Sequence, residues 1–167
     1  MEGNILDVVV NVKRVTKVTK GGKRFAFSAF VVSGDQAGKI GFALGKSRDV
    51  SSAIAKATAK ARKHMIDIPL RGRTLPYHVE GHHGSAHVLL RSAYKGTGVI
   101  AGGAVRAMMD VLGVYDVLAK SLGSANQRNV VKATMNALAQ LRHAQDIARL
   151  RGKTIEEIVK GTDVQAR

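Results

Sequence analysis

The chain has 167 residues, of which 45% are hydrophobic, so it is long enough for one ordinary domain or two small ones with a real core. Lysine and arginine number 27 against 12 acidic residues, and the resulting formal net charge of +15 favours a polyanionic partner, nucleic acid first and a membrane surface second. The lack of cysteine excludes disulfide scaffolds, thiolate metal sites and a cysteine nucleophile.

A membrane partner is not expected. No uncharged apolar run approaches the roughly 18 residues that span a bilayer, and the first residues show no signal-peptide pattern. We therefore expect a cytoplasmic protein.

The first predicted elements form a hairpin with a basic tip. Valines alternate with other residues from Leu6 to Lys13, and Phe25 and Phe27 alternate with small residues between Arg24 and Val32, which is the period of half-buried strands. Gly21–Gly22 lies between them, and no acidic residue occurs from position 8 to 34. A lysine cluster can be only a solvated loop, but charges of one sign beside paired glycines favour contact with a nucleic-acid backbone.

A third strand, Lys39 to Leu44, is followed by a predicted glycine turn and a helix. The turn resembles a P-loop, but its Gly41-x-x-x-Gly45-Lys46-Ser47 spacing is one residue short. An RNA phosphate passing a helix N-terminus needs only a turn and cations, so we assign Lys46 and Arg48 to an RNA backbone.

The predicted helix has two faces. Its apolar stripe is Val50, Ile54, Ala57, Ala61 and Met65. Lys56, Lys60 and Lys63 lie opposite, without an acid at i+4, which does not fit an ordinary salt-bridged solvent face. Three strands followed by a helix is the layout of a double-stranded-RNA-binding domain without its first helix, a module that binds A-form shape and phosphates.

The second half predicts an α/β layer. Both prolines fall between residues 66 and 76, so we place the domains at 1–67 and 68–161, followed by a polar tail, 162–167. Strands are predicted at 77–84, 86–92 and 114–119. The first helix buries Val105, Met108, Met109 and Leu112 and ends at Gly113. The last begins near Asn126 or Asn129 and buries Val130, Val131, Thr134, Met135, Leu138 and Leu141.

Four histidines raise the question of a metal site: His78, His82, His83 and His87. We expect no metal, because an H-x-x-x-H pair ligates zinc from a helix, whereas Glu80–Gly81 together with Gly84 indicates a turn. Contact with a phosphate-rich or polar partner is the preferred interpretation.

A second glycine-rich segment, 96–103, resembles the dinucleotide fingerprint but has alanine where the third glycine belongs, at position 101. A nucleotide-binding enzyme using the loops at 41–47 and 96–103 is therefore the alternative function. Against it, no acid is spaced with a serine or histidine as a catalytic pair. We expect no enzyme activity and no cofactor.

Motifs in a fixed order resemble the bacterial small-ribosomal-subunit protein S-five family along almost the whole chain. They are the segments 14–24, 38–46, 53–65, 96–107, 113–120, 123–126, 129–134 and 151–158. The histidine-rich segment 81–87 departs from the usual sequence pattern of the family. The resemblance implies a double-stranded-RNA-binding-like α+β domain of three strands plus a helix, then an α/β domain with a left-handed β-α-β crossover.

The resemblance also implies a function. The protein would be a structural constituent of the small ribosomal subunit that binds its ribosomal RNA and contributes to subunit assembly and translational accuracy, with no homo-oligomer. Gly98 and Arg106 would face ribosomal protein S-four, with protein S-eight another neighbour and messenger RNA entering nearby. Together with the charge pattern, it assigns RNA binding to Arg14, Thr16, Lys17, Lys20, Gly21, Gly22, Lys23, Arg24, Lys46, Arg48, Lys56, Lys60 and Lys63.

Overall fold

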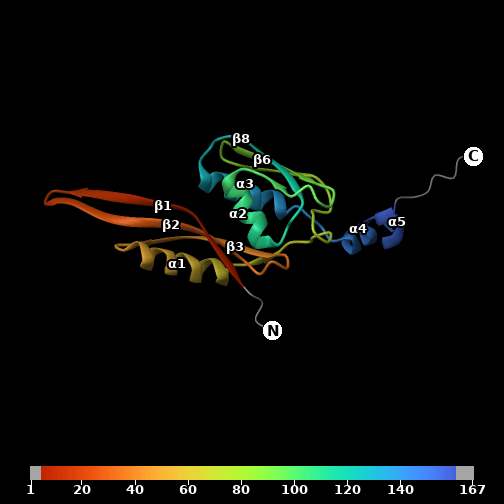
Figure 1. Ribbon diagram of the computed structural model, residues 1–167, viewed down its shortest axis with the longest axis horizontal. Helices are drawn as coiled ribbons and strands as arrows, with labels where there is room; N and C mark the ends of the chain where they lie inside the picture. Colours follow the sequence, from red (N-terminus) through yellow and green to blue (C-terminus); the bar gives the residue numbers. More distant parts are fainter. Residues whose placement is uncertain (1–4, 161–167) are drawn as a thin grey trace, which may run out of the picture.

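The first half of the molecule is an antiparallel sheet with a helix on one face (Figure 1). The computed structural model describes residues 5–160. The strands β1 (Leu6–Thr19), β2 (Gly22–Gly34), β3 (Lys39–Ser47) and β4 (Ile66–Asp67) lie in sequence order, and α1 (Val50–Lys63) packs on β2 and β3. The predicted three strands and helix are confirmed, with the two-residue β4 in addition. The hairpin strands are longer than predicted, because pairing continues through the basic residues to Thr19 and Gly22.

The contact between α1 and the sheet is made of very small residues. Ala53, Ala57 and Ala61 are fully buried. Val50 is 37% exposed, and Ile54 and Met65 are half-buried. The buried face of the helix is therefore rotated by part of a turn from the predicted apolar stripe, and the prediction was wrong to that extent. A Cβ atom on Gly45 would lie 2.2 Å from the Ala53 carbonyl oxygen, and one on Gly41 2.3 Å from that of Ala61. The helix backbone therefore rests directly on the strand, which larger side chains on this face would prevent.

The second half is a mixed sheet. Its strands β5 (Val79–His83), β6 (Ala86–Ser92), β7 (Val99–Ile100) and β8 (Val117–Gly123) lie in the order β5-β6-β8-β7. Strands β7 and β8 are parallel and joined by α2 (Gly103–Leu112), which is the expected β-α-β unit. The hand of this crossover stays a prediction. Helix α3 (Gln127–Leu138) packs on β5 and β6.

Helix ends in this half follow the sequence signals. Gly113 has φ +85° and terminates α2, and the Asn126 side chain accepts a hydrogen bond from the Arg128 N–H at the start of α3. Leu141 is buried but lies beyond the helix. The strand predicted at 114–119 begins later, at Val117, because the N–H groups of Tyr115 and Asp116 donate to the Arg73 carbonyl oxygen instead of a strand.

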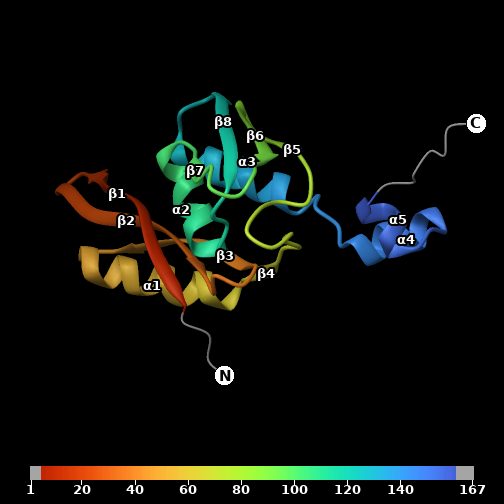
Figure 2. The same ribbon diagram turned by 45° about the vertical axis from the view of Figure 1, so that its right-hand side comes forward.

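Helix α2 lies between the two sheets, so the halves share one core (Figure 2). The N–H groups of Gln36 and Gly38 donate to the carbonyl oxygens of Val111 and Leu112, at 3.0 and 3.2 Å. Phe30, Val32 and Ile40 of the first sheet belong to the same buried cluster as the α2 methionines. The division at residue 67 stays a prediction, and the tail at 162–167 lies outside the described residues.

Two short helices, α4 (Ala144–Arg151) and α5 (Ile155–Lys160), pack on each other after α3 and were not predicted from the sequence. Figure 1 shows them at the opposite end of the molecule from the hairpin tip. Between residues 5 and 160, no helix has both the length and the apolar character needed to cross a membrane.

Candidate nucleic-acid interface

The outer part of the β1–β2 hairpin is a charged ribbon that projects from the body (Figure 1). Lys17 is paired with Arg24 and Val18 with Lys23 across the hairpin, and all four side chains are exposed. Like charges directly opposite each other destabilise a sheet. The Arg14 guanidinium lies over the Phe25 ring, 4.7 Å from its centroid, which supports the ribbon but neutralises none of its charge.

Lysines of neighbouring strands extend this charge toward the body. Ser28 of β2 is paired with Lys13 on one side and with Lys46 on the other, so the two lysines flank it on one face of the sheet. Lys13 was missing from the predicted RNA-binding set. The alternation of β1 continues past Val12, and that signal would have placed Lys13 on the face of Lys17.

The predicted glycine turn at 41–47 does not exist. Gly41, Gly45, Lys46 and Ser47 are all in β3, and the glycines are needed because α1 touches the strand. Since side chains alternate along a strand, Lys46 points away from α1 rather than sitting at its N-terminus. Arg48 lies in the connection before Val50 and is exposed.

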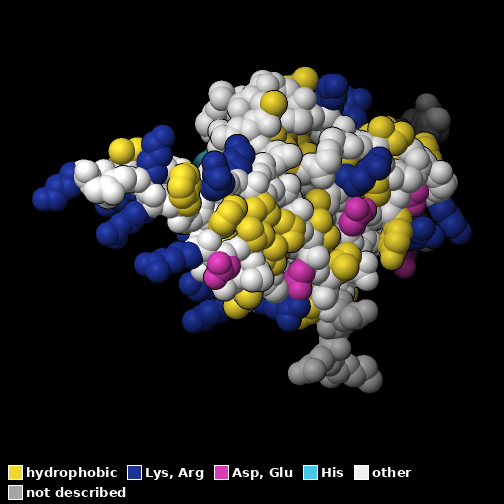
Figure 3. Space-filling model, turned by 60° about the vertical axis from the view of Figure 1, so that its left-hand side comes forward, with side chains coloured by type: hydrophobic (Ala, Val, Ile, Leu, Met, Phe, Trp, Pro, Cys, Tyr) yellow, Lys and Arg dark blue, Asp and Glu magenta, His cyan; other side chains and the backbone are white. Residues whose placement is uncertain are grey.

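Helix α1 adds a further row of cations. Lys56, Lys60 and Lys63 are exposed and lie along one flank of the helix, beside the stripe of buried alanines. Figure 3 shows Lys and Arg side chains projecting from the hairpin and from the edge of the body below it. Within residues 5–160, none of the predicted RNA-binding cations forms an ion pair with an acid.

One cation of α1 is used for a structural contact. Arg62 makes a hydrogen-bonded ion pair with Asp7, which fastens α1 to β1. Burial acts to raise the pKa of Asp7, but the hydrogen bonds and the charge of Arg62 outweigh it, and the pKa is lowered. The same bond and charge raise the pKa of Arg62.

The two residues predicted to form a protein interface lie close together, Gly98 directly before β7 and Arg106 in α2. The Arg106 guanidinium donates to the Val99 carbonyl oxygen at 2.9 Å, next to Gly98, and Arg106 is exposed. Ile100, also beside them, is 55% exposed. This edge combines an apolar side chain with an oriented cation, as protein interfaces do.

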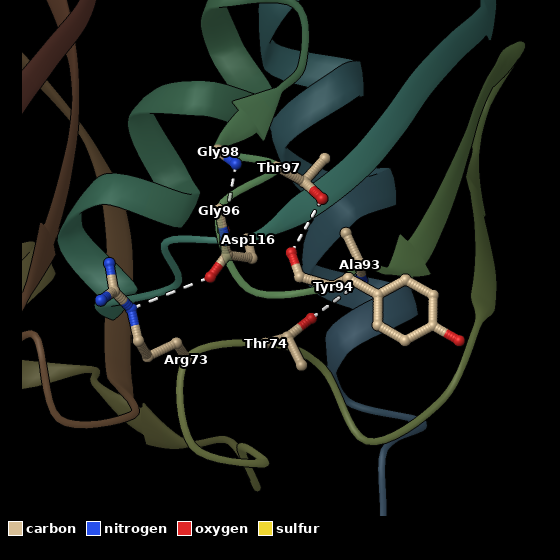
Figure 4. Close-up of polar contacts among 8 residues, drawn as sticks. All are labelled: Arg73, Thr74, Ala93, Tyr94, Gly96, Thr97, Gly98 and Asp116. Carbon is tan, nitrogen blue, oxygen red and sulfur yellow. Dashed lines mark hydrogen bonds and ion pairs between the residues drawn. The ribbon is translucent and has the colours of Figure 1, made fainter.

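The loop that carries Gly98 is held by a buried carboxylate (Figure 4). Oδ1 of Asp116, a residue only 2% exposed, accepts the N–H groups of Gly96 and Gly98 at 2.9 and 3.0 Å. Its Oδ2 lies 3.8 Å from Arg73 Nε. Gly96 and Gly98 have φ +94° and +75°, a region that favours glycine. Neither Asp116 nor Arg73 was predicted, since nothing in the sequence links them.

This geometry removes the nucleotide-binding alternative. A phosphate cradle needs backbone N–H groups that point at the ligand, but two of those in the loop at 96–103 are bound by a carboxylate that would also repel an anion. The segment at 41–47 is a strand against a helix. Neither segment has the form of a triphosphate site.

The basic surface on the protruding hairpin, whose cations are not paired with acids, is the feature expected of a nucleic-acid-binding protein. Family models described as "Ribosomal protein S5, N-terminal domain" and "Ribosomal protein S5, C-terminal domain" match residues 5–69 and 81–151. The chain therefore belongs to the ribosomal protein S5 family.

Relatives agree over nearly the full length. The small ribosomal subunit protein uS5 of Flavobacterium psychrophilum is 54% identical over 155 residues, which cover 93% of this chain and 89% of the relative. That of Bartonella bacilliformis is 53% identical over 166 residues, covering 99% and 85%. The fold predicted from the resemblance is confirmed at the level of family and architecture.

Proposed function

We propose that the protein is a structural constituent of the small ribosomal subunit in the cytoplasm, where it binds small-subunit ribosomal RNA and contributes to subunit assembly and translational accuracy. Family membership supports the subunit, and the basic surface supports the RNA. Catalysis has no part in this function. The RNA-binding set is the predicted one with Lys13 added.

The pairing of Lys17 with Arg24 is the observation that carries the proposal. Two cations opposite each other at the end of a long hairpin, without an acid between them, weaken the free protein. Phosphates of an RNA backbone would turn this repulsion into attraction and release condensed counterions. Exposed glycines at positions 21 and 22 let the backbone approach the RNA closely.

The test replaces Lys17, Lys20, Lys23 and Arg24 with alanine and measures binding to small-subunit ribosomal RNA over a range of salt concentrations. Each lost phosphate contact lowers the slope of log K against log salt by roughly 0.7–0.9, so we expect a drop of about 3. Affinity should fall with it, while circular dichroism stays unchanged.

The matched control replaces four exposed cations outside the hairpin: Arg91, Lys120, Arg142 and Arg151. This variant has the same net charge, so a purely non-specific attraction would weaken equally in both proteins. Equal slopes in the two variants would refute the hairpin interface. Absence of the wild-type protein from purified small subunits would refute the ribosomal function itself.

We further propose that the edge formed by Gly98 and Arg106 contacts ribosomal protein S-four, that protein S-eight is a second neighbour, and that messenger RNA passes nearby. The oriented Arg106 beside the exposed Ile100 supports a protein partner at this edge. Arg106→Ala should weaken co-purification with S-four and leave the RNA salt slope unchanged. Unchanged recovery of S-four would refute this contact.

A further inference from the structure

Two histidines and a glutamate meet on the exposed face of the second sheet. Strands β5 and β6 pair so that His82 lies opposite His87, and Glu80 is two positions from His82 on the same face. Val79 and Gly81 are buried toward α3, which turns Glu80 and His82 outward. A turn is present at Gly84 and Ser85, as Gly84 indicated, but Glu80 and Gly81 are not part of it because both are in β5. The glycine at position 81 is needed because α3 touches the strand: an added Cβ would lie 2.1 Å from the Ala133 carbonyl oxygen.

The ligand atoms of these three side chains are close enough to share one ion. His87 Nε2 lies 3.0 Å from a carboxylate oxygen of Glu80, and all three residues offer ligand atoms within 4.8 Å of one another. Ligands about 2.1 Å from a tetrahedral zinc ion are ~3.4 Å apart. The 3.0 Å between Glu80 and His87 is close to this spacing, and the ligand atom of His82 lies within 4.8 Å of the other two. The His82 and His87 rings are stacked with centroids 4.0 Å apart.

The backbone that carries two of these ligands is fixed from behind. The Asn136 side chain donates to the His82 carbonyl oxygen at 2.9 Å, and that of Gln140 donates to the Glu80 carbonyl oxygen at 3.0 Å. Gly81 is packed against α3 between them. A site on a rigid strand loses less entropy on binding than one on a loop, which favours affinity.

We propose that Glu80, His82 and His87 bind a divalent transition-metal ion, with Zn²⁺ as the probe and a water in the fourth position. Imidazole and carboxylate are the ligand types that zinc uses when three protein groups leave one position open. The two histidines are brought together by pairing between β5 and β6, and not by the H-x-x-x-H spacing on a helix on which the expectation of no metal was based. The inference is independent of the proposed RNA binding.

The test is calorimetric titration of the full-length, metal-stripped protein with Zn²⁺, supported by the visible spectrum of the Co²⁺ complex. We expect one ion per chain and a tetrahedral Co²⁺ spectrum. Glu80→Gln keeps the shape of the side chain and should weaken binding at least about 10-fold, and His82→Ala with His87→Ala should abolish this binding. Circular dichroism checks the fold, and His82→Gln with His87→Gln is used if the alanine variant unfolds.

The controls are His64→Ala and His143→Ala, two exposed histidines outside the cluster. Both should bind Zn²⁺ as the wild type does. Binding that persists unchanged in the double variant, or that is lost equally in the controls, would overturn the site. No binding to the wild-type protein would show that the three side chains only stabilise one another.

Discussion

The two glycine-rich stretches of this chain look alike in sequence but solve different structural problems. In the stretch 41–47 the backbone is an extended strand, and Gly41 and Gly45 make room for the backbone of α1. In the stretch 96–103 the space around Gly96 and Gly98 is open, and glycine is required by positive φ angles. The spacing of the glycines alone therefore does not show whether a stretch lets a helix approach, adopts positive φ angles or binds a phosphate.

The second difference lies in how each stretch is stabilised. The first depends on apolar contact between strand and helix, spread over several buried alanines. The second depends on one carboxylate, Asp116, that accepts two backbone N–H groups. Packing defects should therefore damage the first stretch most, and loss of a hydrogen-bond acceptor should damage the second.

The largest effect is expected for Gly45→Ala. The added methyl group would lie 2.2 Å from the Ala53 carbonyl oxygen and force α1 off the sheet, which we expect to cost about 3 kcal/mol in the free energy of unfolding measured with urea. Gly98→Ala is the matched control, because its added Cβ would meet no atom within 4 Å. Only the strain of alanine at a φ of +75° remains, and we expect it to lower the free energy of unfolding by about 1 kcal/mol. Equal losses of unfolding free energy in the two variants would contradict the different roles of the two glycines.

A smaller effect is expected for Asp116→Ala. It leaves the N–H groups of Gly96 and Gly98 without their acceptor, and because the loop can partly rehydrate we expect a loss of about 2 kcal/mol. Amide hydrogen exchange should show faster exchange at these two residues than elsewhere in the second sheet. Asp116→Asn keeps an acceptor oxygen and should lose less, whereas unchanged exchange in the alanine variant would contradict the role of Asp116.

The smallest effect is expected for Asp7→Asn, which loosens α1 from β1. The pKa of Asp7 is lowered in the folded protein, so its ionised form adds stability above the unfolded pKa of about 3.9, and this stability is lost as pH falls through the folded value. The wild type should therefore be more stable than Asp7→Asn at neutral pH, and the difference should vanish in acid. Thermal unfolding of both proteins between pH 7 and the acid range measures it. A difference that does not change with pH would show that the charge is not involved.

Elements whose signals are local could be predicted from the order of residues alone. Alternating residues predicted the hairpin, Asn126 and Gly113 marked helix ends, and the excess of unpaired cations indicated a polyanionic partner. These features depend on neighbours along the chain and on total charge, so a linear pattern contains them. The ordered motifs indicated the ribosomal protein S5 family, whose two domain models match residues 5–69 and 81–151.

The contacts of several other residues depend on how distant segments pack together, and no local pattern predicts them. Gly45 is next to α1, Gly81 is next to α3, and Asp116 binds a loop that precedes it by some twenty positions. The cluster of Glu80, His82 and His87 likewise depends on the register between two strands. Such contacts join segments that are distant in sequence or depend on a register set by the whole sheet, and no local pattern distinguishes a glycine that bends the chain from one that lets a helix approach it.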